Sequence, residues 1–104
     1  MKLAETISIR AGDRTIPFVE AGVELPLTKK ETLSTARDAQ ESVHCELIAG
    51  ARSVAFVEVG VTSAPRGVPK VALELRIDAG GSVSVRLRGE DGEANAMFSV
   101  ATER

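Results

Sequence analysis

The sequence predicts an all-β fold, an antiparallel β-sandwich of about eight short strands. The first observation is that apolar residues recur at every second position in several short runs, as in "KVALELRID" (residues 70–78). The second is that turns containing Gly and Asp separate these runs at regular spacing. The third is that no segment shows the 3.6-residue period of an amphipathic helix. Together these patterns favour a sandwich or barrel over any helical fold.

The C-terminal half predicts a three-stranded meander. Residues 70–78 are followed by "GSVSVRLRG" (81–89), in which Val and Leu again alternate with polar residues. The "DAGG" between the two runs supplies two glycines for a tight hairpin turn. After the turn "GEDGE", residues 93–100 form the next strand, with Phe98 and Val100 on one face.

The N-terminal half predicts five further strands, at residues 5–10, 15–21, 29–35, 42–49 and 53–59. Pro17 lacks a backbone N–H, so its strand is expected at a sheet edge or a bulge. We expect the strand at 42–49 to pair with residues 31–35 of the preceding strand.

Composition excludes several classes of protein. The chain has 104 residues, a formal net charge of −2, three Phe, no Trp and no Tyr. Its basic residues are spread along the chain, so the charge pattern and stacking aromatics of a nucleic-acid binder are missing. No apolar run is long enough to cross a bilayer, and the first ten residues do not resemble a secretory signal. One domain over residues 1–104, with no membrane partner and a cytoplasmic location, is expected; the lone Cys45 fits a reducing compartment.

The residues do not indicate an enzyme. His44 and Cys45 are the only histidine and cysteine, and neighbours in a strand point to opposite faces, so they cannot form a catalytic pair. Too few ligand residues gather for a metal site. No Gly-rich phosphate loop follows a strand, so no nucleotide or other cofactor is expected.

Three stretches together resemble the peptide-binding β-domain of the DnaK-type seventy-kilodalton heat-shock chaperones. They are "LPLTKKETLSTARDAQESVHCELIAGA" (25–51), "APRGVPKVALELRIDAGGSVSVRL" (64–87) and the turn "GEDG" (89–92). The combination of "STARDAQ" with "APRGVPK" is specific, and the resemblance covers nearly the whole chain. It implies a β-sandwich whose loops hold an extended apolar segment of an unfolded polypeptide.

The resemblance also implies which residues contact the peptide. Leu33, Val43 and Cys45 would line the central pocket, and Ala36 with Ala11 would form an arch over the peptide. The full set of implied peptide-binding positions is Ser8, Arg10, Ala11, Leu33, Ser34, Ala36, Gln40, Val43 and Cys45.

Three of these positions depart from the family pattern. The family usually has an aromatic residue where Leu33 stands, an isoleucine where Cys45 stands, and often a methionine where Ala11 stands. Each missing methylene removes up to about 0.8 kcal/mol of apolar contact. We therefore expect weak peptide binding.

In the family, this domain follows an ATPase domain and precedes a helical lid. We expect neither module in residues 1–104, so ATP would act only through an ATPase domain in a longer chain. Asp38 and Arg66 match positions that contact the lid. The expected function is non-catalytic binding of extended apolar segments. The alternative is an interaction domain that uses its groove or a strand edge to self-associate.

Overall fold

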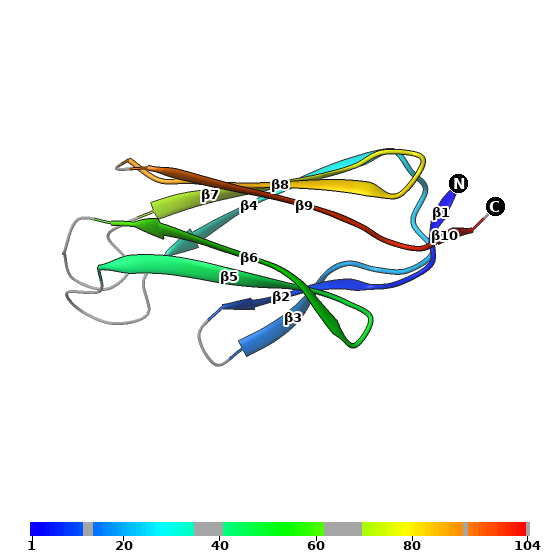
Figure 1. Cartoon of the computed structure of the whole chain (residues 1–104), viewed down its shortest axis with the longest axis horizontal. Helices are drawn as coiled ribbons and strands as arrows, with labels where there is room; N and C mark the ends of the chain where they lie inside the picture. Colours follow the sequence, from blue (N-terminus) through cyan, green and yellow to red (C-terminus); the bar gives the residue numbers. More distant parts are fainter. Residues whose placement is uncertain (12–13, 35–40, 62–69, 91, 104) are drawn as a thin grey trace.

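The computed structural model describes residues 1–11, 14–34, 41–61, 70–90 and 92–103. This part of the chain folds into two packed four-stranded sheets and one two-stranded sheet, all antiparallel, with no helix (Figure 1). The predicted all-β sandwich is confirmed.

The first sheet has the strand order β3-β2-β5-β6 and the second has the order β4-β7-β8-β9. The first consists of β2 (Ile7–Ala11), β3 (Arg14–Val19), β5 (Ser42–Ala49) and β6 (Arg52–Gly60). The second consists of β4 (Leu27–Ser34), β7 (Lys70–Ile77), β8 (Ser82–Arg88) and β9 (Glu93–Ser99). The small sheet pairs β1 (Lys2–Leu3) with β10 (Thr102–Glu103).

The predicted meander is present as β7-β8-β9, and Pro17 lies in the edge strand β3, as expected. The pairing predicted between residues 42–49 and 31–35 is wrong. Strand β5 pairs with β2 and β6, whereas β4 crosses to the other sheet and pairs with β7, with Leu33 opposite Val71. The inward face of β4 carries Lys29 and Glu31, which stay exposed. Only an edge position gives such charges access to water.

The core lies between the inner faces of the two large sheets. Strands β5, β7 and β8 bury every second side chain, as the period-two pattern predicts. Burying one Val or Leu side chain stabilises the fold by about 1.5–3 kcal/mol, so these central strands supply most of the driving force. The inward residues of these three strands are Val43, Cys45, Leu47, Ala49, Val71, Leu73, Leu75, Ile77, Val83, Val85 and Leu87.

A lysine ties the two sheets together along the side formed by the edge strands β3 and β4. The Lys29 ammonium donates a hydrogen bond to the Phe18 carbonyl oxygen and lies 4.9 Å from the centre of the Phe18 ring. The contact combines a charge-assisted hydrogen bond with a cation–π interaction. These two interactions stabilise the charged Lys29 side chain in a depression that Pro17, Phe18 and Leu27 also line.

Glu5 joins segments that are far apart in sequence. Its carboxylate accepts hydrogen bonds from Arg52 Nη2 and from the Ala101 backbone N–H, each at 3.1 Å. The bond from Ala101 and then the Arg52 guanidinium lower the Glu5 pKa below its ordinary value of 4.5, although burial opposes the shift. The ionised form of Glu5 therefore holds the start of β6 and the C-terminal segment against the N-terminal segment.

A lowered pKa in the folded state makes the Glu5 contribution depend on pH. Its contribution is complete above the unfolded-state pKa and is lost as the pH falls through the folded-state pKa. The variant Glu5→Gln should therefore melt at a lower temperature than the native chain at pH 7, and the difference should shrink as the pH falls below 4.5. Melting curves followed by circular dichroism measure this. The exposed Glu20→Gln is the control; a pH-independent difference for Glu5→Gln would contradict the assignment.

The hairpin between β7 and β8 depends on Asp78 and Gly81. Asp78 Oδ1 accepts hydrogen bonds from the backbone N–H groups of Gly80 and Ser82, both at 2.9 Å. Gly81 has a φ of +88°, a left-handed conformation that favours glycine. A Cβ at Gly81 would also collide with the Val100 carbonyl oxygen. This turn therefore requires glycine for both its backbone angle and its close packing.

Two glycine variants separate these effects. Gly22 has a similar φ of +97°, but a methyl group at this position would have no neighbouring atom within 4 Å. Gly22→Ala should therefore cost only the backbone strain, about 1–2 kcal/mol. Gly81→Ala adds a steric clash and should cost about 3–5 kcal/mol. Urea unfolding curves measure both values. Equal losses would show that the packing against Val100 does not matter.

Candidate functional site

One end of the sandwich gathers the predicted peptide-contacting positions that the structure describes. Strands β2 and β4 end there, and β5 and β7 begin there (Figure 1). Ser8, Arg10 and Ala11 belong to β2, Leu33 and Ser34 to β4, and Val43 and Cys45 to β5. The remaining predicted positions, Ala36, Asp38, Gln40 and Arg66, lie outside the described residues.

The three predicted pocket residues all face the space between the sheets. Val43 and Cys45 point inward from β5 and are only 3% and 0% exposed. Leu33 belongs to the other sheet, packs against the same core and remains half-buried. Leu33 is therefore the member of this trio with open surface. A ligand would reach Val43 and Cys45 only after neighbouring side chains moved.

Ser8 and Arg10 lie on a different face. They alternate with the buried Ile7 and Ile9, so their side chains project from the outer face of the first sheet. Arg10 Nε donates a hydrogen bond to Thr15 Oγ1 at 3.1 Å, and Arg10 Nη1 lies 3.6 Å from a Glu46 carboxylate oxygen. The structure thus does not bring Ser8 and Arg10 together with the inward-facing trio.

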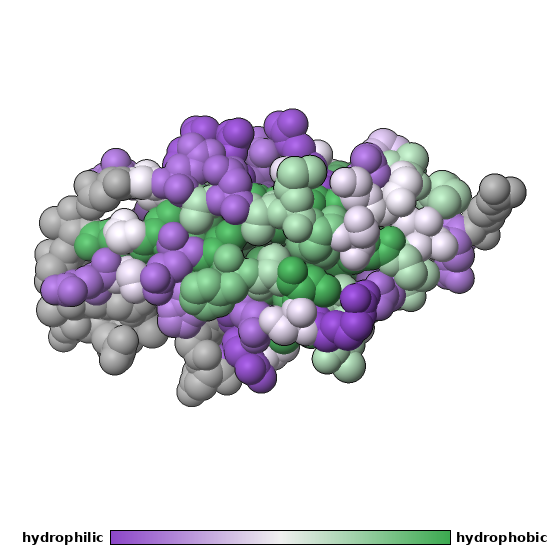
Figure 2. All heavy atoms as spheres, in the orientation of Figure 1, coloured by the Kyte–Doolittle hydropathy of each residue, from purple (hydrophilic) through white to green (hydrophobic). Residues whose placement is uncertain are grey.

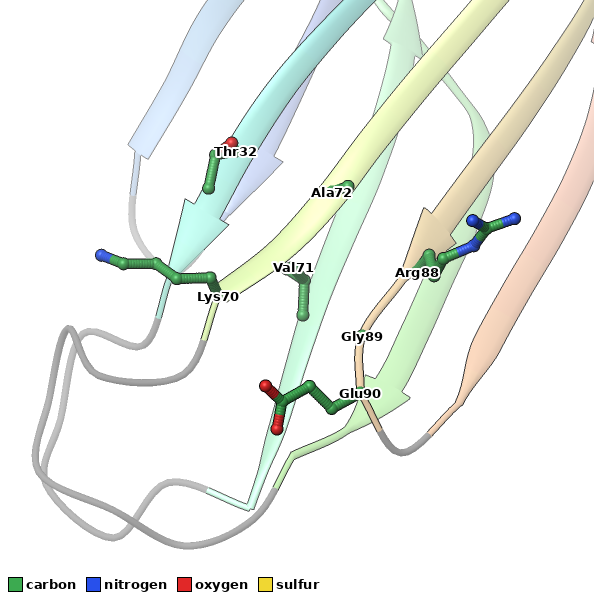
Figure 3. Close-up of a pocket in the computed structure, with 7 residues that line it drawn as sticks. All are labelled: Thr32, Lys70, Val71, Ala72, Arg88, Gly89 and Glu90. Atoms are coloured by element: carbon green, nitrogen blue, oxygen red, sulfur yellow. The ribbon is translucent and has the colours of Figure 1, made fainter.

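A depression at the same end of the molecule was not anticipated from the sequence. It lies where β4, β7 and β8 reach the loop-bearing end (Figure 3). Charged side chains of Lys70, Arg88 and Glu90 lie around small or apolar ones in this open depression. Such a surface offers polar and apolar contacts but no arrangement of a nucleophile with a base. Its lining residues are Thr32, Lys70, Val71, Ala72, Arg88, Gly89 and Glu90.

Gly89 shapes this depression. A methyl group on Gly89 would lie 3.1 Å from Val71 Cγ1 and 3.7 Å from Val59 Cγ2. The absence of a side chain therefore lets the end of β8 approach β7 and β6 closely. The sequence signal was a glycine directly after a strand, which is also the ordinary signature of a turn, so it did not identify a lining residue.

His44 and Cys45 point to opposite faces of β5, as the alternation predicts. His44 is exposed and stacks on Phe56, with ring centres 5.6 Å apart. Burial, and secondarily the Glu46 carboxylate, raise the pKa of the Cys45 thiol to about 11. Such a thiol stays protonated at neutral pH and is a poor nucleophile. Among the described residues, no three His, Cys, Asp or Glu side chains are placed to hold a metal ion.

No helix in the described part of the chain is long and apolar enough to cross a membrane. The two packed sheets, with a half-buried leucine and a charged depression at one end, define an antiparallel β-sandwich domain whose candidate site is at its loop-bearing end.

Comparison with known proteins identifies the family. The family model described as "Hsp70 protein" matches residues 3–103. The chain is also 35% identical over 92 residues to the chaperone protein DnaK of Ureaplasma urealyticum serovar 10 (strain ATCC 33699 / Western). That alignment covers 80% of this chain and 15% of the DnaK protein. The chain belongs to the Hsp70 family of chaperones. It spans about 15% of the length of this curated relative, and the predicted resemblance is confirmed at the level of the family.

The burial of Cys45 predicts its reactivity. In the native protein at pH 8, a thiol reagent such as 5,5′-dithiobis(2-nitrobenzoate) should react with Cys45 at least about 100-fold more slowly than in urea, because the thiol is protonated and inaccessible. Release of the coloured thiolate product measures the rate. Rapid reaction of the folded chain would contradict the packing described for β5 and would reopen a nucleophilic role for Cys45.

Proposed function

We propose that residues 1–104 form one domain that binds extended apolar segments of unfolded polypeptides at its loop-bearing end. The observation that carries the proposal is the placement of Leu33 at the end of the edge strand β4. There, a large apolar side chain keeps open surface beside the buried core of a chain that belongs to a chaperone family. The proposed pocket includes Val43 and Cys45 as its inner wall.

The chemistry of an unfolded client supports this assignment. An extended segment offers unsatisfied backbone N–H and C=O groups together with large aliphatic side chains. A receptor therefore needs polar main-chain partners next to an apolar contact. In the proposal, Ser34 at the end of β4 belongs to the main-chain contact region. Ala11 at the end of β2 and Ala36 form the arch over the peptide, and Gln40 lies beside the groove.

The same proposal excludes catalysis from these residues. The buried Cys45 thiol has a raised pKa, and His44 points away from it. The sequence contains no Gly-rich phosphate loop after a strand, so any dependence on ATP would come from an ATPase domain, with Asp38 and Arg66 as candidate contacts to a lid. We place the protein in the cytoplasm, where a lone cysteine stays reduced.

A matched pair of leucine variants tests the site. Leu33 and Leu27 lie on the same face of β4, both half-buried, but Leu27 is at the opposite end of the strand. With a fluorescent seven-residue peptide centred on leucine, Leu33→Ala should weaken binding about 5- to 30-fold, the equivalent of about 1–2 kcal/mol of lost apolar contact. Leu27→Ala should leave the dissociation constant within about twofold. Fluorescence anisotropy measures both.

The peptide itself supplies a second control. Changing its central leucines to aspartate should abolish binding, because a charge would be moved from water into an apolar contact. Equal effects of Leu33→Ala and Leu27→Ala would move the site elsewhere. No saturable binding at protein concentrations up to about 1 mM, which detects an interaction of roughly −4 kcal/mol, would reject peptide binding by this chain.

A further inference from the structure

Strand β9 presents a row of free backbone groups along one side of the sandwich. The Val100 N–H donates to the Gly81 carbonyl, and the Gly89 N–H donates to the Gly92 carbonyl, each at 2.8 Å. Hydrogen-bonded and non-hydrogen-bonded pairs alternate along antiparallel strands. These two bonds therefore determine which residues of β9 form backbone hydrogen bonds with β8. The residues of β9 that bond to β8 are thus Ala94, Ala96 and Phe98. The residues whose N–H and C=O point away from β8 are Glu93, Asn95, Met97 and Ser99.

No strand in the described part of the chain covers that row, because β9 is the last strand of its sheet. The other three large-sheet edges carry features that oppose pairing with another chain. Strand β3 contains Pro17, β4 carries charges that include Lys30, and β6 carries Glu58 and a register shift against β5. In contrast, residues 94–99 contain no proline and no charge, and β9 pairs with β8 without a register shift.

The exposed side chains of β9 are Glu93, Asn95, Met97 and Ser99, and Met97 is the apolar one among them. Met97 is 74% exposed on β9, and Phe56 is 58% exposed on β6, the edge strand that contacts β9 from the other sheet. Figure 2 shows apolar surface along the middle of the face where β6 and β9 lie in Figure 1. Exposed apolar side chains next to unpaired backbone groups are the features of a strand-pairing interface.

We propose that β9 pairs antiparallel with β9 of a second copy of this chain, about a two-fold axis at Met97. In that register the two Met97 residues exchange backbone hydrogen bonds with each other, and Asn95 stands opposite Ser99 of the second copy. Ala96 faces Phe98 of the second copy on the inner side. Between residues 94 and 100, apolar residues therefore meet apolar residues, and polar residues meet polar ones.

The charges at the end of the strand agree with this register. Glu93 would stand opposite the uncharged Ala101 of the second copy. Glu93 is already held by Arg86, with Arg86 Nε 2.8 Å from Glu93 Oε1. Between residues 93 and 101, which the structure describes, no like charges meet across the axis, so this part of the edge is complementary to itself. This self-complementarity is why we name a second copy, and not an unrelated peptide, as the occupant.

This interface is separate from the proposed peptide site. It lies along the side of the second sheet, whereas Leu33 and Val43 lie at the loop-bearing end. Self-association through β9 therefore does not require peptide binding. A failure of the peptide-binding proposal would not by itself support or reject self-association.

Sedimentation velocity of the whole chain over a range of concentrations tests the proposal. The native chain should pass from monomer to dimer as its concentration rises. Met97→Lys places two like charges at the axis and should raise the dimer dissociation constant at least tenfold. Ser84→Lys is the matched control, because Ser84 is exposed, lies on β8 and is the direct cross-strand neighbour of Met97. Ser84→Lys should leave the constant unchanged.

A mixture of variants tests the register itself. Met97→Lys and Met97→Glu should each be monomeric alone, and mixing them should restore a heterodimer, because opposite charges would then meet at the axis. Unchanged melting temperatures show that each variant is folded. A native chain that stays monomeric up to about 1 mM overturns the proposal, as does a dimer that Met97→Lys leaves intact. A monomeric native chain whose peptide binding is weakened by Met97→Lys would instead assign the β9 edge to extended peptides and would also overturn it.

Discussion

The structure depends on the burial of one face of each four-stranded sheet against the other. Because side chains alternate along a strand, the central strands β5, β7 and β8 bury every second residue and leave the others in water. This packing leaves groups exposed at two places on the sandwich. Where the core reaches the loop-bearing end, Leu33 packs against it and keeps open surface. Where the second sheet ends at β9, backbone groups and Met97 remain exposed.

The sequence predicted the features that depend on local patterns. The alternation in residues 70–78 predicted strand β7 and its buried face, and Pro17 predicted an edge. The opposite directions of His44 and Cys45 followed from the same period. The partner of β4 could not be predicted in this way, because sequence spacing does not tell whether a connection stays in one sheet or crosses to the other.

Part of the candidate site could be predicted from the sequence, and part required the folded structure. The family resemblance selected Leu33, Val43 and Cys45, and the structure brings these three toward one inter-sheet space. It also selected Ser8 and Arg10, which instead project from the outer face of the first sheet. The depression shaped by Gly89 joins residues that are distant in sequence, so no local pattern could reveal it. Contacts made only by the packing of separate strands require the folded structure.

In the proposed function, a client segment binds at the loop-bearing end of the sandwich. Nuclear magnetic resonance titration of the ¹⁵N-labelled chain with a leucine-centred peptide tests this directly, because each backbone amide reports its own surroundings. Binding at this end should produce saturable shifts at the amides of Leu33, Val43 and Val71. It should leave the amides of Leu3 and Thr102 unchanged at the opposite end, where β1 pairs with β10. Shifts that are largest at the β1–β10 end, or absent at peptide concentrations near about 1 mM, would show that no client segment binds at the loop-bearing end.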